Sequence, residues 1–123
     1  FMHSLVCWSL QDHVILIKYH HRPLLEGFHR DDATLRQMLN TTSGEHVHIL
    51  IDLLRVPADS PNPLEYLESL AHPRVRSVVL YGGAEQVLNL DDWYNPRVHV
   101  ARDEDAALRL LDQLDDALSY DMA

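Results

Sequence analysis

The chain has 123 residues, of which 46% are hydrophobic and 24% charged, and this composition suits one globular domain over residues 1–123. Its formal net charge of −9 argues against nucleic acids and anionic membrane surfaces as partners, because both attract basic patches. No apolar stretch approaches the roughly 20 residues that span a bilayer. The single cysteine, Cys7, allows no internal disulfide, so we expect a cytoplasmic protein.

Two β-rich segments open the chain, at residues 4–10 and 14–19, and the polar turn Gln11-Asp12-His13 joins them. A short turn between such segments predicts an antiparallel hairpin. Cys7 lies in the apolar run of the first segment, so we expect a buried structural thiol rather than a reactive one.

Apolar residues at helical spacing follow Pro23, a residue that suits the first turn of a helix. One helix from about residue 23 to residue 40 accounts for this pattern, and so do two shorter helices with Asp32 as the N-cap of the second. Gly44 follows the pattern and is free to adopt the left-handed conformation that often ends a helix.

The strongest predicted strand covers residues 47–53, which are apolar on both faces, as a central strand between helices should be. An irregular loop with three prolines follows over residues 57–63. Ser60 or Asn62 can cap the next helix, with a proline directly behind either cap. The predicted buried stripe of this helix is Leu64, Leu67, Leu70 and Ala71.

Residues 75–81 form the fourth predicted strand, which ends at Gly82 and Gly83, and a short helix follows over about residues 84–90. Residues 97–101 form the fifth strand. Asp103 then caps a last helix, whose acidic first turn suits the positive end of the helix dipole. Its predicted apolar stripe is Ala106, Ala107, Leu110, Leu111, Leu114, Ala117 and Leu118.

The predicted order of elements is therefore ββαβαβαβα. Strands that are separated by helices favour parallel pairing with right-handed crossovers, while the first hairpin adds one antiparallel strand. The sequence predicts an α/β fold, in which helices pack against a mixed five-stranded sheet.

Four segments of this pattern resemble the SpoIIAA-like proteins, relatives of the STAS domains of sulfate transporters and anti-sigma-factor antagonists. They are residues 48–53, 70–73, 77–82 and 106–111. The resemblance implies a non-catalytic regulatory or protein-binding domain without a cofactor, whose partner would be a protein. A binder of a small apolar or anionic ligand, held between the sheet and the loop at residues 55–63, is the alternative.

Residues 52–60 are similar to the segment that carries a phosphorylated serine in the STAS antagonists, and Ser60 takes the place of that serine. The pair Asp59-Ser60 comes one residue earlier than in those proteins, and Pro61-Asn62-Pro63 replaces a turn that contains glycine. A serine that caps the following helix is the alternative interpretation of Ser60.

The candidate ligand or partner site lies where the third and fourth strands end, because open parallel sheets bind ligands beyond the carboxyl ends of their strands. Helix starts near Asn62 and Ala84 would point N–H groups there, which favours a carboxylate, a phosphate or a phosphorylated segment. A ligand-free surface of two stiffened turns is the alternative. The predicted site residues are Arg55, Asp59, Ser60, Tyr81, Gly82 and Gly83.

Nine histidines are the most unusual feature of the composition, and none stands at the spacing of a known metal motif, so no metal site is predicted. His46 and His48 share one face of the third strand, since side chains alternate along a strand. The nine are His3, His13, His20, His21, His29, His46, His48, His72 and His99.

No acid, base and nucleophile can be grouped by spacing, so no residue is assigned as catalytic. Trp93 and Tyr94 form an aromatic pair in a loop, which suits either an interface or a lid over the core. Exposed aromatics and an edge strand favour a homodimer.

Overall fold

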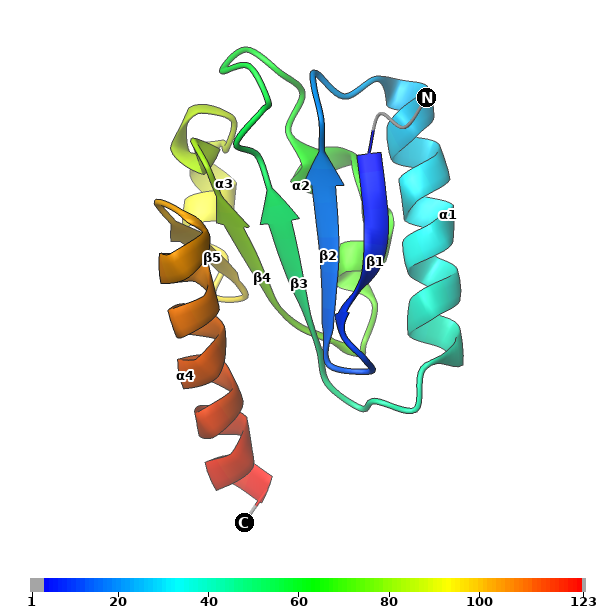
Figure 1. Ribbon diagram of the computed structural model, residues 1–123, viewed down its shortest axis with the longest axis vertical. Helices are drawn as coiled ribbons and strands as arrows, with labels where there is room; N and C mark the ends of the chain where they lie inside the picture. Colours follow the sequence, from blue (N-terminus) through cyan, green and yellow to red (C-terminus); the bar gives the residue numbers. More distant parts are fainter. Residues whose placement is uncertain (1–3, 123) are drawn as a thin grey trace.

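The computed structural model describes the backbone of residues 4–122 and the side chains of residues 4–115. It has an α/β fold with a five-stranded mixed sheet in the order β1-β2-β3-β4-β5 (Figure 1). β1 and β2 pair antiparallel and all other neighbours pair parallel, which confirms the predicted fold class. The strands are β1 (Ser4–Leu10), β2 (Val14–Tyr19), β3 (Val47–Asp52), β4 (Val75–Tyr81) and β5 (Val98–Ala101).

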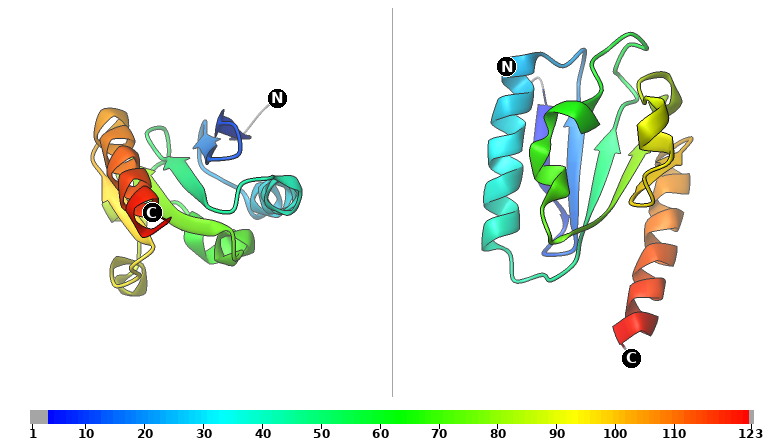
Figure 2. Two further views of the ribbon diagram at one scale, coloured as in Figure 1. Left: turned by 90° about the horizontal axis from the view of Figure 1, so that it is seen from below. Right: turned by 180° about the vertical axis from the view of Figure 1, so that it is seen from behind.

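Helices cover the two faces of the sheet unequally. On one face α1, α2 and η1 bury a large apolar core that contains Ile49 and Ile51 of β3, while α4 packs on the other face over β3, β4 and β5 (Figure 2). The helices are α1 (Leu25–Thr41), α2 (Pro63–Tyr66), α3 (Leu90–Trp93) and α4 (Glu104–Met122), with 3₁₀ turns η1 (Glu68–Ala71) and η2 (Ala84–Gln86). None of the described helices is long and apolar enough to cross a membrane.

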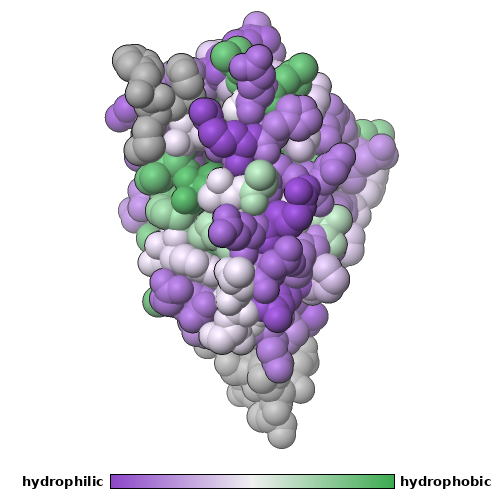
Figure 3. Space-filling view, turned by 90° about the vertical axis from the view of Figure 1, so that its right-hand side faces the viewer, coloured by the Kyte–Doolittle hydropathy of each residue, from purple (hydrophilic) through white to green (hydrophobic). Residues whose placement is uncertain are grey.

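The part of the α4 face that belongs to β1 and β2 carries half-buried apolar side chains. Leu5, Cys7 and Leu16 all lie there, since they pair across the hairpin on that face. The expectation of a buried Cys7 is wrong, because no helix covers this end of the sheet. From the side of α1, the mostly hydrophilic surface gives way to apolar groups toward this edge (Figure 3).

The connection between α1 and β3 is held against the hairpin turn. Asp12 in that turn has φ 63°, a left-handed conformation that aspartate tolerates better than most residues. Its carboxylate accepts a hydrogen bond from the Thr42 hydroxyl at the end of α1. Gly44 does not adopt the predicted left-handed conformation. It is required there because a Cβ atom would overlap the Asp12 carbonyl oxygen.

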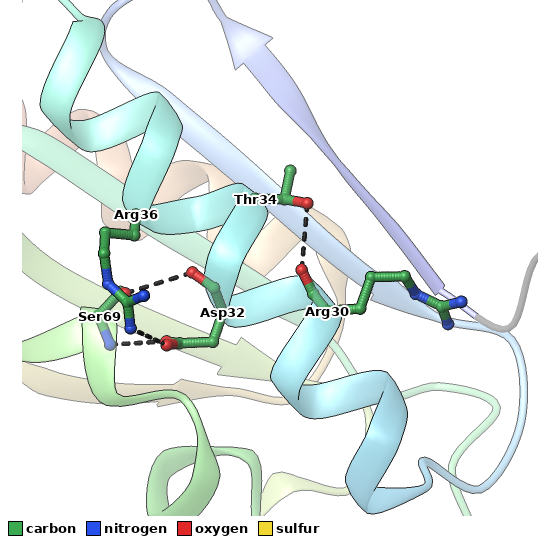
Figure 4. Close-up of polar contacts among 5 residues, drawn as sticks. All are labelled: Arg30, Asp32, Thr34, Arg36 and Ser69. Atoms are coloured by element: carbon green, nitrogen blue, oxygen red, sulfur yellow. Dashed lines mark hydrogen bonds and ion pairs between the residues drawn. The ribbon is translucent and has the colours of Figure 1, made fainter.

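Residues 25–41 form one continuous helix, so the first of the two interpretations of this segment is correct. Asp32 lies buried within the helix, where its carboxylate accepts a hydrogen bond of 2.7 Å from the backbone N–H of Ser69 in η1 (Figure 4). Arg36, one turn further on, approaches the same carboxylate to 2.6 Å. Asp32 therefore joins α1 to η1 instead of starting a second helix.

The segment between β3 and β4 forms two short helical pieces instead of one helix. Asn62 is the cap, since its side chain accepts from the N–H of Leu64 at 3.0 Å, so the interpretation of Ser60 as the cap is wrong. The helix breaks at Leu67, which has φ −92° and ψ 82°. This break changes the phase of the stripe, so that Leu67 and Leu70 are buried while Ala71 is exposed.

The segment between β4 and β5 is also divided, into η2 and α3, where one helix was predicted. Asn89 and Asp92 form a reciprocal capping box that starts α3 separately. Asp103 caps α4 as expected, with a hydrogen bond of 2.8 Å from the N–H of Ala106. Ala107 and Leu111 of the predicted stripe are buried, whereas the side chains of Ala117 and Leu118 lie outside the described residues.

Packing of α4 on the sheet can be tested with two leucines of the same helix. Leu111 is 5% exposed and Leu108 is 43% exposed. We expect Leu111→Asp to lower the free energy of unfolding by about 3 kcal/mol or more, because it removes a buried leucine and places a charge in an apolar core. Leu108→Asp is the control and should cost less than about 1 kcal/mol. Equal losses in urea denaturation would contradict this packing.

Candidate functional site

A cavity of about 520 Å³ opens at the amino ends of β3, β4 and β5, beside the middle of α4. This volume lies in the range of small-molecule sites, which is about 300–1,000 Å³. We call it the histidine pocket and define it by the polar residues that line it, which are His46, His48, Arg76, Ser77, Arg97 and His99. Leu114 of α4 lines the side that faces the helix.

The strand register brings these residues together from distant parts of the sequence. His48 on β3 pairs with Ser77 on β4, and His46 lies two residues before His48. His99 on β5 pairs with Val79, which shares a face with Ser77 because side chains alternate along β4. Three histidines of the sequence therefore meet in one cavity.

A polar chain through His48 anchors the pocket to α4. Nδ1 of His48 lies 2.5 Å from the Ser77 hydroxyl oxygen, and Nε2 lies 2.8 Å from Oδ1 of Asp115 on α4. The carboxylate lies off the direction of the ring N–H, so Nε2 has a close acidic neighbour but no well-directed hydrogen bond. We assign the ring proton to Nε2, because the acidic Asp115 lies closest to that nitrogen. Nδ1 then accepts a hydrogen bond from the serine hydroxyl.

Burial dominates the ionisation of His48, which is only 1% exposed. It lowers the pKa of His48 because a charged imidazolium loses its solvation, and the Asp115 carboxylate offsets only part of this effect. His48 is therefore neutral at pH 7 and can serve as a hydrogen-bond acceptor and donor.

Asp115, His48 and Ser77 have the composition of a hydrolase triad, but their surroundings differ from one. Ser77 is the third residue of β4 and is 2% exposed. Acyl transfer also needs preorganised N–H donors for an oxyanion, and these usually come from a turn or a helix start beside the nucleophile. Ser77 itself lies within a strand rather than at such a turn or helix start, so we assign it no catalytic role.

The Arg97 guanidinium is held in a fixed position at the pocket. Its Nη2 atom donates to the carbonyl oxygens of Leu70 at 3.2 Å and Val75 at 2.5 Å. A guanidinium carries five N–H donors, so two carbonyls occupy only part of its capacity. Arg97 thus brings a preorganised positive charge to a pocket in which none of the described lining residues is acidic.

At the carboxyl ends of β3 and β4, two of the sequence-predicted residues pack against the chain after β3. Tyr81 is buried, burial and the neighbouring Asp52 carboxylate raise the pKa of its hydroxyl, and its carbonyl accepts from the N–H of Leu53. Gly82, with φ 85°, lies so close to Leu54 that a Cβ atom would come within 2.6 Å of the Leu54 nitrogen. Gly83 follows with φ 88° and starts η2.

The other sequence-predicted residues lie in the loop after β3. Asp59 is exposed and forms an ion pair of 2.9 Å with Arg22, while Arg55 is exposed to solvent. Ser60 is buried, and its hydroxyl has no hydrogen-bond partner within the part of the chain that the structure describes. The structure thus joins Tyr81 and Gly82 to residues 53–54 and ties Asp59 to Arg22, and a ligand site at this edge stays a prediction.

Sequence reasoning found the first part of the histidine pocket, since it placed His46 and His48 on one face of a strand. Ser77, Arg97 and His99 were missed because their proximity depends on the registers of β4 and β5. Across the described residues, no group of three or more histidine, cysteine, aspartate or glutamate side chains is arranged to hold a metal ion. His3 lies outside that range.

In comparisons with known proteins, no family model and no curated protein matches this chain. The similarity to STAS domains therefore rests on the segments quoted above. The histidine pocket is interpreted from its own geometry.

Neutral burial of His48 predicts how stability depends on pH. The pKa of His48 in the folded protein lies below the unfolded value of about 6.5. Its contribution to the free energy of unfolding is therefore complete above about pH 6.5 and is lost as the pH falls from that value toward the folded pKa. The slope from one such group is at most about 1.4 kcal/mol per pH unit. The free energy of unfolding, measured between pH 8 and pH 5, should fall more steeply in the parent than in His48→Gln. Parallel profiles would contradict the assignment.

Proposed function

We propose that this protein is a non-catalytic binding domain whose histidine pocket takes a small organic anion, carrying a carboxylate or a phosphate group. One observation carries the proposal. Among the side chains of residues 4–115, a cavity of about 520 Å³ is lined by two arginines and three histidines and by no acid, in a chain whose net charge is −9. Basic side chains gathered in a concave site are the groups that recognise carboxylates and phosphates.

The groups of the pocket suit an anion in different ways. Arg97 offers a charge in a fixed position, because two carbonyl oxygens already orient its guanidinium. Arginine is also suited to bidentate contact with carboxylate and phosphate oxygens. His46 and His99 are half-buried at the mouth and can donate hydrogen bonds from their rings.

His48 would link binding to protonation. An anion in the pocket adds a negative charge near the imidazole, which favours its charged form. By linkage, protonation of His48 must then strengthen anion binding by the same factor. The pocket therefore suits a domain that responds to both ligand and pH.

A regulatory domain that binds a protein partner is the second proposal, and the surface of α3 supports it. Leu90, Trp93 and Tyr94 are 69%, 50% and 79% exposed. The two adjacent aromatic residues follow Leu90 by about one helical turn. A lid over the core would bury these side chains, whereas an interface leaves them exposed in the free protein. The STAS resemblance implies the same role. Light scattering that gives twice 14.2 kDa would identify a second copy of the chain as that partner.

Anion binding can be tested by calorimetry with inorganic phosphate and a short dicarboxylate. A hydrogen bond to a charged group contributes roughly 1.5–3 kcal/mol. The double variant His46→Leu/His99→Leu, which removes both donors, should therefore bind at least about ten-fold more weakly than the parent. His29→Leu, at an exposed histidine on α1, is the control and should bind as the parent does.

Two outcomes would contradict this proposal. One is equal binding by the double variant and the parent, which would place the anion elsewhere. The other is covalent labelling of Ser77 by a fluorophosphonate, because that reagent reacts with activated serine nucleophiles and would show that the Asp115–His48–Ser77 chain is catalytic.

A further inference from the structure

A second cavity, of about 180 Å³, lies at the opposite end of the sheet, between the carboxyl end of β2, the start of β1 and the first turns of α1. We call it the α1 pocket. It is lined by Ser4, Tyr19, Glu26, Gly27, Arg30 and Asp31, together with Pro23 and Leu24. None of these residues belongs to the histidine pocket or to the predicted site at the ends of β3 and β4.

Tyr19 gives this cavity an unsatisfied polar group. The side chain is 1% exposed, and its hydroxyl has no hydrogen-bond partner among the described residues. The ring is held edge-on against Phe28, with centroids 5.7 Å apart, and Phe28 stacks on Tyr66 at 5.1 Å. A buried hydroxyl without a partner is costly, and here packing fixes it in the wall of a cavity.

The start of α1 adds further donors. Leu24 at the N-cap provides no side-chain hydrogen bond, and the first helical bond runs from the N–H of Phe28 to the carbonyl of Leu24. The N–H groups of residues 25–27 therefore have no acceptor among the described residues. Both they and the Tyr19 hydroxyl hydrogen need an acceptor oxygen.

Gly27 keeps the cavity open. A Cβ atom at this position would have only the Arg30 guanidinium within 4 Å, at 3.9 Å, and Gly27 is not among the glycines with positive φ. Neither backbone conformation nor close packing thus requires glycine here, although glycine weakens a helix relative to alanine. What its missing side chain provides is space in the α1 pocket.

The charges around the α1 pocket select a neutral ligand. Asp31 is buried and both of its oxygens lie 2.8 Å from the Ser4 hydroxyl, while Glu26 adds a second carboxylate at the rim. These acids disfavour an anion. Arg30, which extends from α1 toward the start of β1 (Figure 4), and the positive end of the helix dipole disfavour a cation.

We propose that the α1 pocket binds a small neutral compound whose amide, carbonyl or hydroxyl oxygen accepts hydrogen bonds from Tyr19 and from the first N–H groups of α1. This site is separate from the anion site of the proposed function, and either one can be correct without the other. A cavity of about 180 Å³ limits the ligand to a few non-hydrogen atoms, since one water occupies about 30 Å³ in the liquid.

Three probes of nearly equal size and different charge test the site: propanamide, propionate and propylammonium. Titration of the full chain with each, followed by amide NMR, should show propanamide shifting the resonances of residues 25–28 at least ten-fold more tightly than the other two. Gly27→Leu should abolish these shifts, because its side chain fills the cavity, while the helix gains a better helix former.

Two tyrosine variants separate the ligand role from a structural one. Tyr19→Phe should weaken propanamide binding at least ten-fold without lowering the melting temperature, because the hydroxyl it removes has no hydrogen-bond partner in the described part of the chain. Tyr81→Phe is the control, because it removes the hydroxyl of a tyrosine that is equally buried but does not line the α1 pocket, and it should leave propanamide binding unchanged.

The proposal is overturned if propanamide shifts no resonance of residues 25–28, which would mean that water alone fills the cavity. It is equally overturned if propionate or propylammonium binds as tightly as propanamide, or if Tyr19→Phe binds propanamide as the parent does.

Discussion

The parallel register of β3 between β2 and β4 is the constraint on which both ends of this sheet depend. In that register His48 lies beside Ser77, and four residues later Asp52 lies beside Lys18 and Tyr81. Because side chains alternate, a slip of β3 by one residue would turn His48 and Asp52 into the apolar core on the α1 face. β3 is buried along its whole length, so the sequence cannot tolerate that slip, and the polar groups at both ends are fixed by the same pairing.

The carboxyl ends of the parallel strands lie near helix starts, and their amino ends lie near helix ends. This difference decides how each edge of the sheet can recognise a ligand. Carboxyl ends of parallel strands lead into helix starts, whose N–H groups attract acceptors, as at the start of α1 beside Tyr19. Amino ends follow helix ends, which carry a partial negative charge. Arg74 already donates to the carbonyls of Leu39 and Thr42 at the end of α1. An anion at that edge therefore depends on basic side chains, and the histidine pocket provides them.

Much of the fold follows from local sequence. Alternation and apolar runs predict all five strands within a residue or so, and the order of elements predicts the mixed sheet. The errors fall where a contact distant in sequence decides. The requirement for glycine at position 44 follows from its close approach to Asp12, which the sequence does not show. The burial of Asp32 inside α1 is explained by its hydrogen bond from the N–H of Ser69, 37 residues away. The two breaks in the short helical segments are of another kind: Leu67 leaves the helical conformation, and Asn89 starts α3 through a local capping box with Asp92.

Site prediction was harder than fold prediction for a related reason. The rule that parallel sheets bind ligands at the carboxyl ends of their strands pointed to Tyr81, Gly82 and Gly83. Gly82 packs directly against the backbone of Leu54, a contact that no sequence pattern reveals, and a ligand site at this edge stays a prediction. The histidine pocket depends on the registers that join three strands, β3, β4 and β5. The α1 pocket depends on the Tyr19 hydroxyl, which has no hydrogen-bond partner among the residues that the structure describes.

The net charge of −9 imposes a last condition on the histidine pocket, because the protein as a whole repels the anions that the pocket would bind. Repulsion from distant exposed acids acts over many ångströms, whereas the arginine and histidine contacts act within hydrogen-bond range. The Debye length is about 8 Å at physiological ionic strength, so salt screens the distant acids more than the local contacts. Anion binding therefore depends on groups within about one Debye length of the pocket. Among the described side chains, Asp115 is the acid that matters most there, since its Oδ1 lies 2.8 Å from Nε2 of His48.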